Sequence, residues 1–184
     1  MSETAPMRSE PAIDWERLGM FPSRHAEVDG LRLAYLDEGD PGAPAVWLMH
    51  GEPTWSFLWR RVIPPLVEAG FRCVAPDLAG FGRSDKPEDL GWYSYDRHVA
   101  LMSGLLEQLD LSGATMVVHD WGGPIGLRLA VEHRERFDRL VILDTGLFTG
   151  HQRMTDAWQA FRDFVERTRT CRSRCSSTAG RCAP

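Results

Sequence analysis

The sequence of 184 residues lacks several features that mark specialised protein classes. It has no run of about 18 apolar residues, which is the length that a membrane-spanning helix needs. Its first segment, MSETAPMRSEPAIDWERLG, lacks the basic-then-apolar pattern of a secretory signal peptide. Basic residues are not in excess: the formal net charge is −5, whereas nucleic-acid-binding proteins usually present a basic face. We therefore expect a cytoplasmic globular protein without a nucleic-acid or membrane partner.

Cysteine is also sparse, and the four cysteines are unevenly placed. Cys73 falls in an apolar run and is predicted to be a buried small hydrophobic residue. Cys171, Cys175 and Cys182 lie in an Arg/Ser-rich segment that has no histidine and no second pair at zinc-finger spacing. We therefore expect no metal site among these cysteines.

Short apolar runs predict the strands of a sheet. A hairpin is predicted over His25–Gly39, because an Asp29-Gly30 turn separates two segments that alternate apolar and polar residues. Four continuous apolar runs follow, at Ala45–Met49, Phe71–Asp77, Ala114–His119 and Arg139–Asp144. Continuous runs are typical of parallel strands that are covered on both faces.

Helical periodicity separates these runs. It is found over Trp55–Ala69, where Pro64 and Pro65 interrupt it, and more cleanly over Tyr95–Leu109 and Gly122–His133. Alternating strands and helices predict an α/β fold with a doubly wound, mostly parallel sheet.

The C-terminal segment differs from the rest. Gly150–Thr168 is predicted to be a helix with Trp158, Phe161 and Val165 on one face, whereas RTCRSRCSSTAGRCAP has no periodicity. With GC-rich codons, a shift of reading frame from Arg169 can give an apolar, structured-looking sequence. We hypothesise that the last residues arise from a frameshift, the alternative being a natural truncation.

The stretch VVHDWGGPIG places Asp120 where a buried run turns into a helix that begins at Gly122. This arrangement resembles the nucleophile elbow of the α/β-hydrolase fold, G-x-S-x-G. Val118 stands in place of the first glycine, and Asp120 stands in place of the serine. The alternative interpretation is that Asp120 only caps the following helix.

A second motif, HGEPTWSFLWR, directly follows the Ala45–Met49 run, where this fold builds its oxyanion hole. The backbone N–H of Glu52 is predicted to point at a developing oxyanion, and the N–H of Trp121 supplies the second donor. Between the two motifs, DLAGFGRSDKP is interpreted as a conformational, glycine-rich loop.

Together HGEPTWSFLWR, PDLAGFGRSDKP and VVHDWGGPIGL resemble the haloalkane dehalogenases over roughly residues 15–168. The resemblance implies an α/β-hydrolase that converts a haloalkane and water to an alcohol and a halide, with Asp120 as nucleophile and no cofactor. It also implies that the indole N–H of Trp121, a donor on an apolar body, binds the halide. Epoxide hydrolases share the aspartate nucleophile and are the nearest alternative.

An aspartate suits this chemistry because a haloalkane offers an sp³ carbon with a leaving group. A carboxylate can displace that group in line and leave an alkyl ester on Asp120. Water activated by a histidine then attacks the ester carbonyl, and the oxyanion donors Glu52 and Trp121 act at that step.

No histidine of the sequence fits the role of base. His50 belongs to the oxyanion loop and is predicted to be structural, and His119 points away from the nucleophile by strand alternation. No motif surrounds His25, His98, His133 and His151. The resemblance implies a base beyond residue 184. Asp144 is either a backup acid of the triad or a polar loop residue near the site.

We accordingly divide the chain into an N-terminal extension, part of an α/β-hydrolase core, the start of a helical cap and an aberrant tail, at residues 1–24, 25–148, 149–168 and 169–184. Such a truncated chain would expose one edge of its sheet and would stop at the ester stage. A non-enzymatic, pseudogene-like fragment is the further alternative. Substrate chain length, halogen preference and oligomeric state are not predicted.

Overall fold

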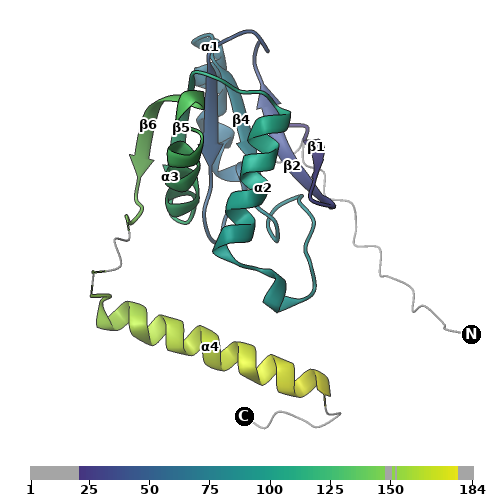
Figure 1. Cartoon of the computed structure of the whole chain (residues 1–184), viewed down its shortest axis with the longest axis vertical. Coiled ribbons are helices and arrows are strands. Elements are labelled where there is room, and N and C mark those ends of the chain that lie inside the picture. The colour runs from purple at the N-terminus through teal and green to yellow at the C-terminus, as the bar shows by residue number, and fades with distance from the viewer. Residues whose placement is uncertain (1–20, 148–150, 152, 178–184) are drawn as a thin grey trace, which may run out of the picture. The chain divides into compact units, whose positions relative to one another are not determined.

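A β-hairpin begins the fold in the computed structural model, which describes residues 21–147, 151 and 153–177 (Figure 1). Strands β1 (Arg24–Val28) and β2 (Leu31–Glu38) pair antiparallel, with Val28 opposite Leu31. Asp29 and Gly30 connect them with φ angles of 49° and 74°. Positive φ at both central residues is the geometry of a tight two-residue hairpin turn. The predicted hairpin is confirmed.

The hairpin joins a sheet of six strands in the order β1-β2-β4-β3-β5-β6. The four further strands are β3 (Ala45–Met49), β4 (Arg72–Pro76), β5 (Ala114–His119) and β6 (Phe137–Leu143). They pair parallel with one another, whereas β2 pairs antiparallel with both β1 and β4. The predicted strands and the mostly parallel sheet are confirmed.

Helices cover both faces of this sheet (Figure 1). Helices α2 (Tyr95–Gln108) and α3 (Gly122–Glu132) pack on one face, and the short α1 (Ile63–Glu68) lies on the other. Side-chain alternation along β3 supplies both cores: Trp47 and Met49 join the first cluster, and Val46 and Leu48 join the second. All five residues of β3 are buried, as its continuous apolar run predicts.

Two predicted helices have different bounds in the structure. The segment Trp55–Ala69 is not one helix but the 3₁₀ helix η1 (Ser56–Arg61) followed by α1. Pro64 lies in the first turn of α1, where a missing N–H costs no helical hydrogen bond, so the helix restarts there. Two more 3₁₀ turns are η2 (Leu90–Trp92) and η3 (Arg134–Arg136).

The last helix, α4 (Asp156–Ser177), is shifted from the predicted Gly150–Thr168, and Gly150 lies outside the described residues. The hydroxyl oxygen of Thr155 accepts the N–H of Trp158 at 3.2 Å, which is the hydrogen bond of a helix N-cap and fixes the start. Arg169–Ser177 contains neither Gly nor Pro, so the chain can continue as a helix beyond Thr168 without an apolar face.

Strand β6 departs from the prediction that it is covered on both faces. Leu140, Val141, Ile142 and Leu143 are 41–55% exposed. β6 is the last strand in the order, and within the described residues it pairs only with β5. The apolar run of β6 therefore lies on an edge strand of the sheet.

The chain divides into two units between Leu147 and Phe148. The first unit contains the sheet with α1, α2 and α3, and the second contains α4. Among the described residues, no helix is both long and apolar enough to cross a membrane.

Candidate active site

The order of the strands defines where a site forms in the first unit. From β3 the chain first adds β4 on one side and then β5 on the other, so the connections diverge between β3 and β5. In open α/β sheets, ligands bind at the carboxyl ends of strands at such a switch point. Glu52 lies in the loop after β3, and Asp120 and Trp121 follow β5, so the predicted site residues flank this point.

Asp120 adopts a backbone conformation that is unusual for a residue with a side chain. Its φ is 50°, in the left-handed region. The carbonyl oxygen of Asp120 accepts the hydroxyl of Thr145 at 2.6 Å and the N–H of Gly123 at 2.8 Å, and these bonds hold the turn. The N-cap of α3 is Trp121, and no side chain caps it. The carboxylate of Asp120 therefore does not cap the helix, and it is available for chemistry.

The loop after β3 reaches this carboxylate. The backbone N–H of Glu52 donates to Oδ1 of Asp120 at 2.8 Å. Gly51 permits the approach, because a Cβ at that position would collide with Oδ1 of Asp120 and lie 2.5 Å from the backbone nitrogen of Trp121. The structure thus brings together Asp120 and the backbone nitrogens of both predicted oxyanion donors.

The other predicted groups lie around this centre. Trp121 is 47% exposed, so its indole is open to a ligand. Asp144 directly follows β6, and His119 pairs with Leu143 in the parallel register, so Asp144 and Asp120 leave neighbouring strands at the same sheet edge. Asp144 is exposed, has a φ of 36° and makes no hydrogen bond to Asp120 within the described part of the chain.

All six histidines belong to the described residues, and no hydrogen bond joins any of them to Asp120 there. His50 is fully buried: its Nε2 accepts the N–H of Leu78 at 2.9 Å, and its Nδ1 lies 3.0 Å from the carbonyl of Gly51. One nitrogen accepts and the other donates, which requires the neutral ring. Burial lowers the pKa of His50 from its ordinary value of 6.5, so His50 is structural, as the sequence predicts.

This environment predicts a pH dependence of stability. Because the folded state lowers the pKa of His50, the unfolded chain binds the proton more readily, and the free energy of unfolding falls as pH drops below 6.5. The slope that one such group contributes is at most about 1.4 kcal/mol per pH unit. Urea denaturation at pH 7.5 and 5.5 measures it. H50Q keeps an acceptor for the N–H of Leu78, so a loss of stability on acidification equal to that of the wild type would contradict the assignment.

Sequence reasoning missed two residues of the site. Thr145 bonds the carbonyl of Asp120, and Asp77 lies fully buried at the end of β4 inside the glycine-rich loop that was interpreted as conformational only. A carboxylate placed directly between a buried strand and a glycine-rich turn was the available signal for Asp77. The sequence around Thr145 carried no such signal, because the carbonyl that its hydroxyl bonds belongs to Asp120, 25 positions away.

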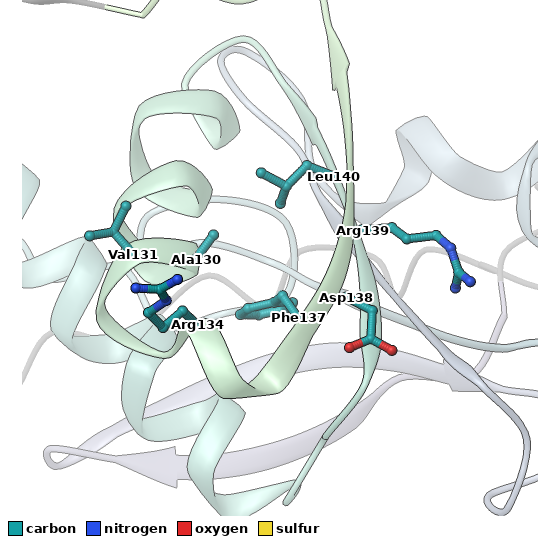
Figure 2. Close-up of a pocket in the computed structure, with 7 residues that line it drawn as sticks. All are labelled: Ala130, Val131, Arg134, Phe137, Asp138, Arg139 and Leu140. Atoms are coloured by element: carbon teal, nitrogen blue, oxygen red, sulfur yellow. The ribbon is translucent and has the colours of Figure 1, made fainter.

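A separate groove of about 480 Å³ lies between α3 and β6 (Figure 2). It is lined by Ala130, Val131, Arg134, Phe137, Asp138, Arg139 and Leu140. Figure 2 shows Phe137 and Leu140 pointing from β6 towards α3, while Arg139 points away. Phe137 begins β6, at the opposite end of the parallel strands from Asp120, so this groove is not part of the candidate site. No group of His, Cys, Asp and Glu suited to a metal ion occurs in the described residues.

Comparison with protein families agrees with this geometry. Residues 44–176 match the model of the alpha/beta hydrolase fold. The chain therefore belongs to the α/β-hydrolase fold family, and its sheet order and the sharp turn after β5 agree with that assignment.

Within that family, the resemblance to haloalkane dehalogenases is confirmed. The chain is 51% identical over 135 residues to a haloalkane dehalogenase of Mycolicibacterium paratuberculosis, and this alignment covers 73% of this chain and 45% of that protein. The chain is 48% identical over 141 residues to a haloalkane dehalogenase of Psychrobacter cryohalolentis, and this alignment covers 77% of this chain and 46% of that protein. The chain thus spans about half the length of the curated relatives it matches.

Solved structures give the same result. A tetrameric haloalkane dehalogenase, DpaA of Paraglaciecola agarilytica, superposes with a TM-score of 0.74 at 39% identity, covering 78% of this chain and 50% of that chain. An epoxide hydrolase of Vigna radiata superposes with a TM-score of 0.67 at 30% identity, covering 76% and 46%. Both classes use this fold, and DpaA is nearer in sequence to this chain than the Vigna radiata enzyme is.

Proposed function

We propose that this chain carries the nucleophile and oxyanion donors of a haloalkane dehalogenase, which hydrolyses a haloalkane through an alkyl ester on Asp120. One observation carries the proposal: the N–H of Glu52 donates a hydrogen bond at 2.8 Å to Oδ1 of Asp120, the residue that forms the sharp turn between β5 and α3. The bond leaves Oδ2 as the attacking oxygen. The turn presents a carboxylate where the family presents its nucleophile.

The reaction follows from these atoms. A lone pair on Oδ2 of Asp120 attacks the halogen-bearing carbon, the carbon–halogen bond breaks, and its electron pair leaves with the halide. The indole N–H of Trp121 donates to the departing halide. Water then attacks the carbonyl of the Asp120 ester, the N–H groups of Glu52 and Trp121 receive the oxyanion, and collapse releases the alcohol. A base must take a proton from that water and return one to the departing alkoxide, and the regenerated carboxylic acid of Asp120 loses the second proton, so that the net products are the alcohol, the halide and a proton.

A haloalkane is favoured over an epoxide by the relatives. The curated relatives of 48–51% identity are haloalkane dehalogenases, whereas the epoxide hydrolase of Vigna radiata is 30% identical to this chain.

The remaining assignments belong to the same proposal. Residues 149–168 are proposed as the start of a helical cap, and Asp144 as a backup acid at the end of β6. Haloalkane and water are the proposed small-molecule partners, in a cytoplasmic enzyme. Within the described residues no hydrogen bond joins a histidine to Asp120, so we expect the ester to persist on this chain.

This expectation gives a stoichiometric test. With cysteines blocked by N-ethylmaleimide, the chain is incubated with 1-bromohexane, and bromide is measured by ion chromatography. We expect release to stop at one equivalent per chain, accompanied by a covalent hexyl adduct that hydroxylamine removes, because hydroxylamine cleaves esters and leaves thioethers intact. Continued release beyond one equivalent would contradict a persistent ester, and the absence of both bromide release and a labile adduct would refute the proposed function. Cys73 adds little background, because burial raises the pKa of its thiol to about 11.

A further inference from the structure

Asp77 is a fully buried carboxylate for which the proposed reaction has no role. It follows β4, and its two oxygens accept different backbone donors. Oδ1 accepts the N–H of Ser56 at 2.8 Å, and Oδ2 accepts the N–H of Arg83 at 2.8 Å. Gly82 leaves room for this carboxylate, because a Cβ at residue 82 would collide with Oδ2. The glycine-rich loop is therefore folded around Asp77.

The bond to Ser56 fixes one end of the loop after β3, and a neighbouring bond fixes the other end. The N–H of Leu78 donates to Nε2 of His50 at 2.9 Å. His50 also bonds the carbonyl of Gly51, which accepts the N–H of Thr54 at 3.0 Å as well. Asp77 and Leu78, adjacent at the end of β4, thus hold residues 50–56 at both ends.

Glu52 lies between these two attachments, and its N–H donates to Asp120. The loop carries no regular strand or helix between β3 and η1 that could fix Glu52 by itself. The direction of its N–H is therefore set by where the loop is held. A carboxylate is suited to this task because it presents two acceptors, whereas an amide would turn its NH₂ towards one of the two N–H donors.

We propose that Asp77 is a positioning residue, which acts through the loop of residues 50–56 to aim the Glu52 N–H at the Asp120 carboxylate. This inference rests on the proposed function for its catalytic consequence. Its structural content, that Asp77 controls the Glu52–Asp120 hydrogen bond, can be measured separately. A misplacement of reacting groups by about 1 Å can reduce a rate by about a hundredfold, so loosening this loop has a measurable effect.

The test compares D77N with D37N in the full chain. Asp37 is a matched control, since its side chain is 8% exposed and pairs with Arg72 through two hydrogen bonds, at 2.7 and 3.0 Å, at the far end of β4. Amide hydrogen exchange of Glu52 is measured together with the saturating rate of Asp120 alkylation by 1-bromohexane. We expect D77N to lose protection at Glu52 and to alkylate about tenfold more slowly, with the half-saturating haloalkane concentration unchanged. D37N is expected to keep both wild-type values.

Equal Glu52 protection in D77N and D37N would overturn the inference. If the wild type forms no adduct at all, the proposed function fails, and the exchange data still decide the role of Asp77. If D77N does not fold, native-state exchange of the wild type in low urea replaces it. We then expect the amides of Glu52, Ser56 and Arg83 to open with one shared urea dependence, and an independent opening of Glu52 would contradict the proposal.

Discussion

D120N is expected to abolish formation of the hexyl ester and the bromide release that accompanies it. An amide has no anionic oxygen with which to displace a halide, so we expect the rate to fall by about a thousandfold or more. The substitution preserves shape, and its carbonyl oxygen can still accept the N–H of Glu52, which donates to Asp120 at 2.8 Å. The variant should therefore fold as the wild type does. Intact mass spectrometry after thiol blocking and ion chromatography of bromide measure the effect.

D138N is the matched control for this experiment. Asp138 is exposed near the amino end of β6, at the opposite end of the parallel strands from Asp120. D138N removes the same charge as D120N without changing the turn at Asp120, so we expect adduct formation at the wild-type rate. A hydroxylamine-labile adduct on D120N at the wild-type rate would show that another carboxylate is the nucleophile.

G122A is expected to produce a large loss of stability. A Cβ on Gly122 would lie 2.5 Å from the carbonyl oxygen of His50 and 2.6 Å from that of Met49. Both are backbone atoms at the end of the central strand β3, so neither can move without distorting the sheet. We expect the free energy of unfolding to fall by roughly 2–4 kcal/mol, measured by urea denaturation followed by circular dichroism.

G42A separates this steric effect from the ordinary cost of replacing a glycine. A Cβ on Gly42 would meet only Oδ1 of Asp40, at 3.5 Å, which is normal van der Waals contact. We expect G42A to change the free energy of unfolding by less than about 1 kcal/mol. If G122A and G42A were equally stable, the close packing of the elbow against β3 would be wrong.

The central strands and the elbow could be predicted because their signals are local. Ala45–Met49 and Ala114–His119 are apolar runs of strand length, and the structure begins and ends β3 and β5 at those residues. Asp120 follows β5 directly, and the pair Gly122-Gly123 allows the sharp turn into α3. The motif therefore carried both the position of the carboxylate and the sharp turn that presents it.

Features that depend on distant residues could not be predicted in this way. Asp77 gains its role from the N–H of Ser56, which lies 21 positions away and comes close only once β3 and β4 pair. The exposure of Ile142 depends on the place of β6 in the strand order, which an apolar run does not encode. The end of α4 differed because Arg, Ser and Thr residues permit a helix even without an apolar face.

Locating the alkyl group tests the central claim most directly. The thiol-blocked wild-type chain is reacted with 1-bromohexane, digested and sequenced by tandem mass spectrometry. We predict a hydroxylamine-labile hexyl group on Asp120, the residue that receives the Glu52 N–H at 2.8 Å. A labile hexyl group on any other carboxylate, or none on the peptide that contains Asp120, would contradict its assignment as the nucleophile.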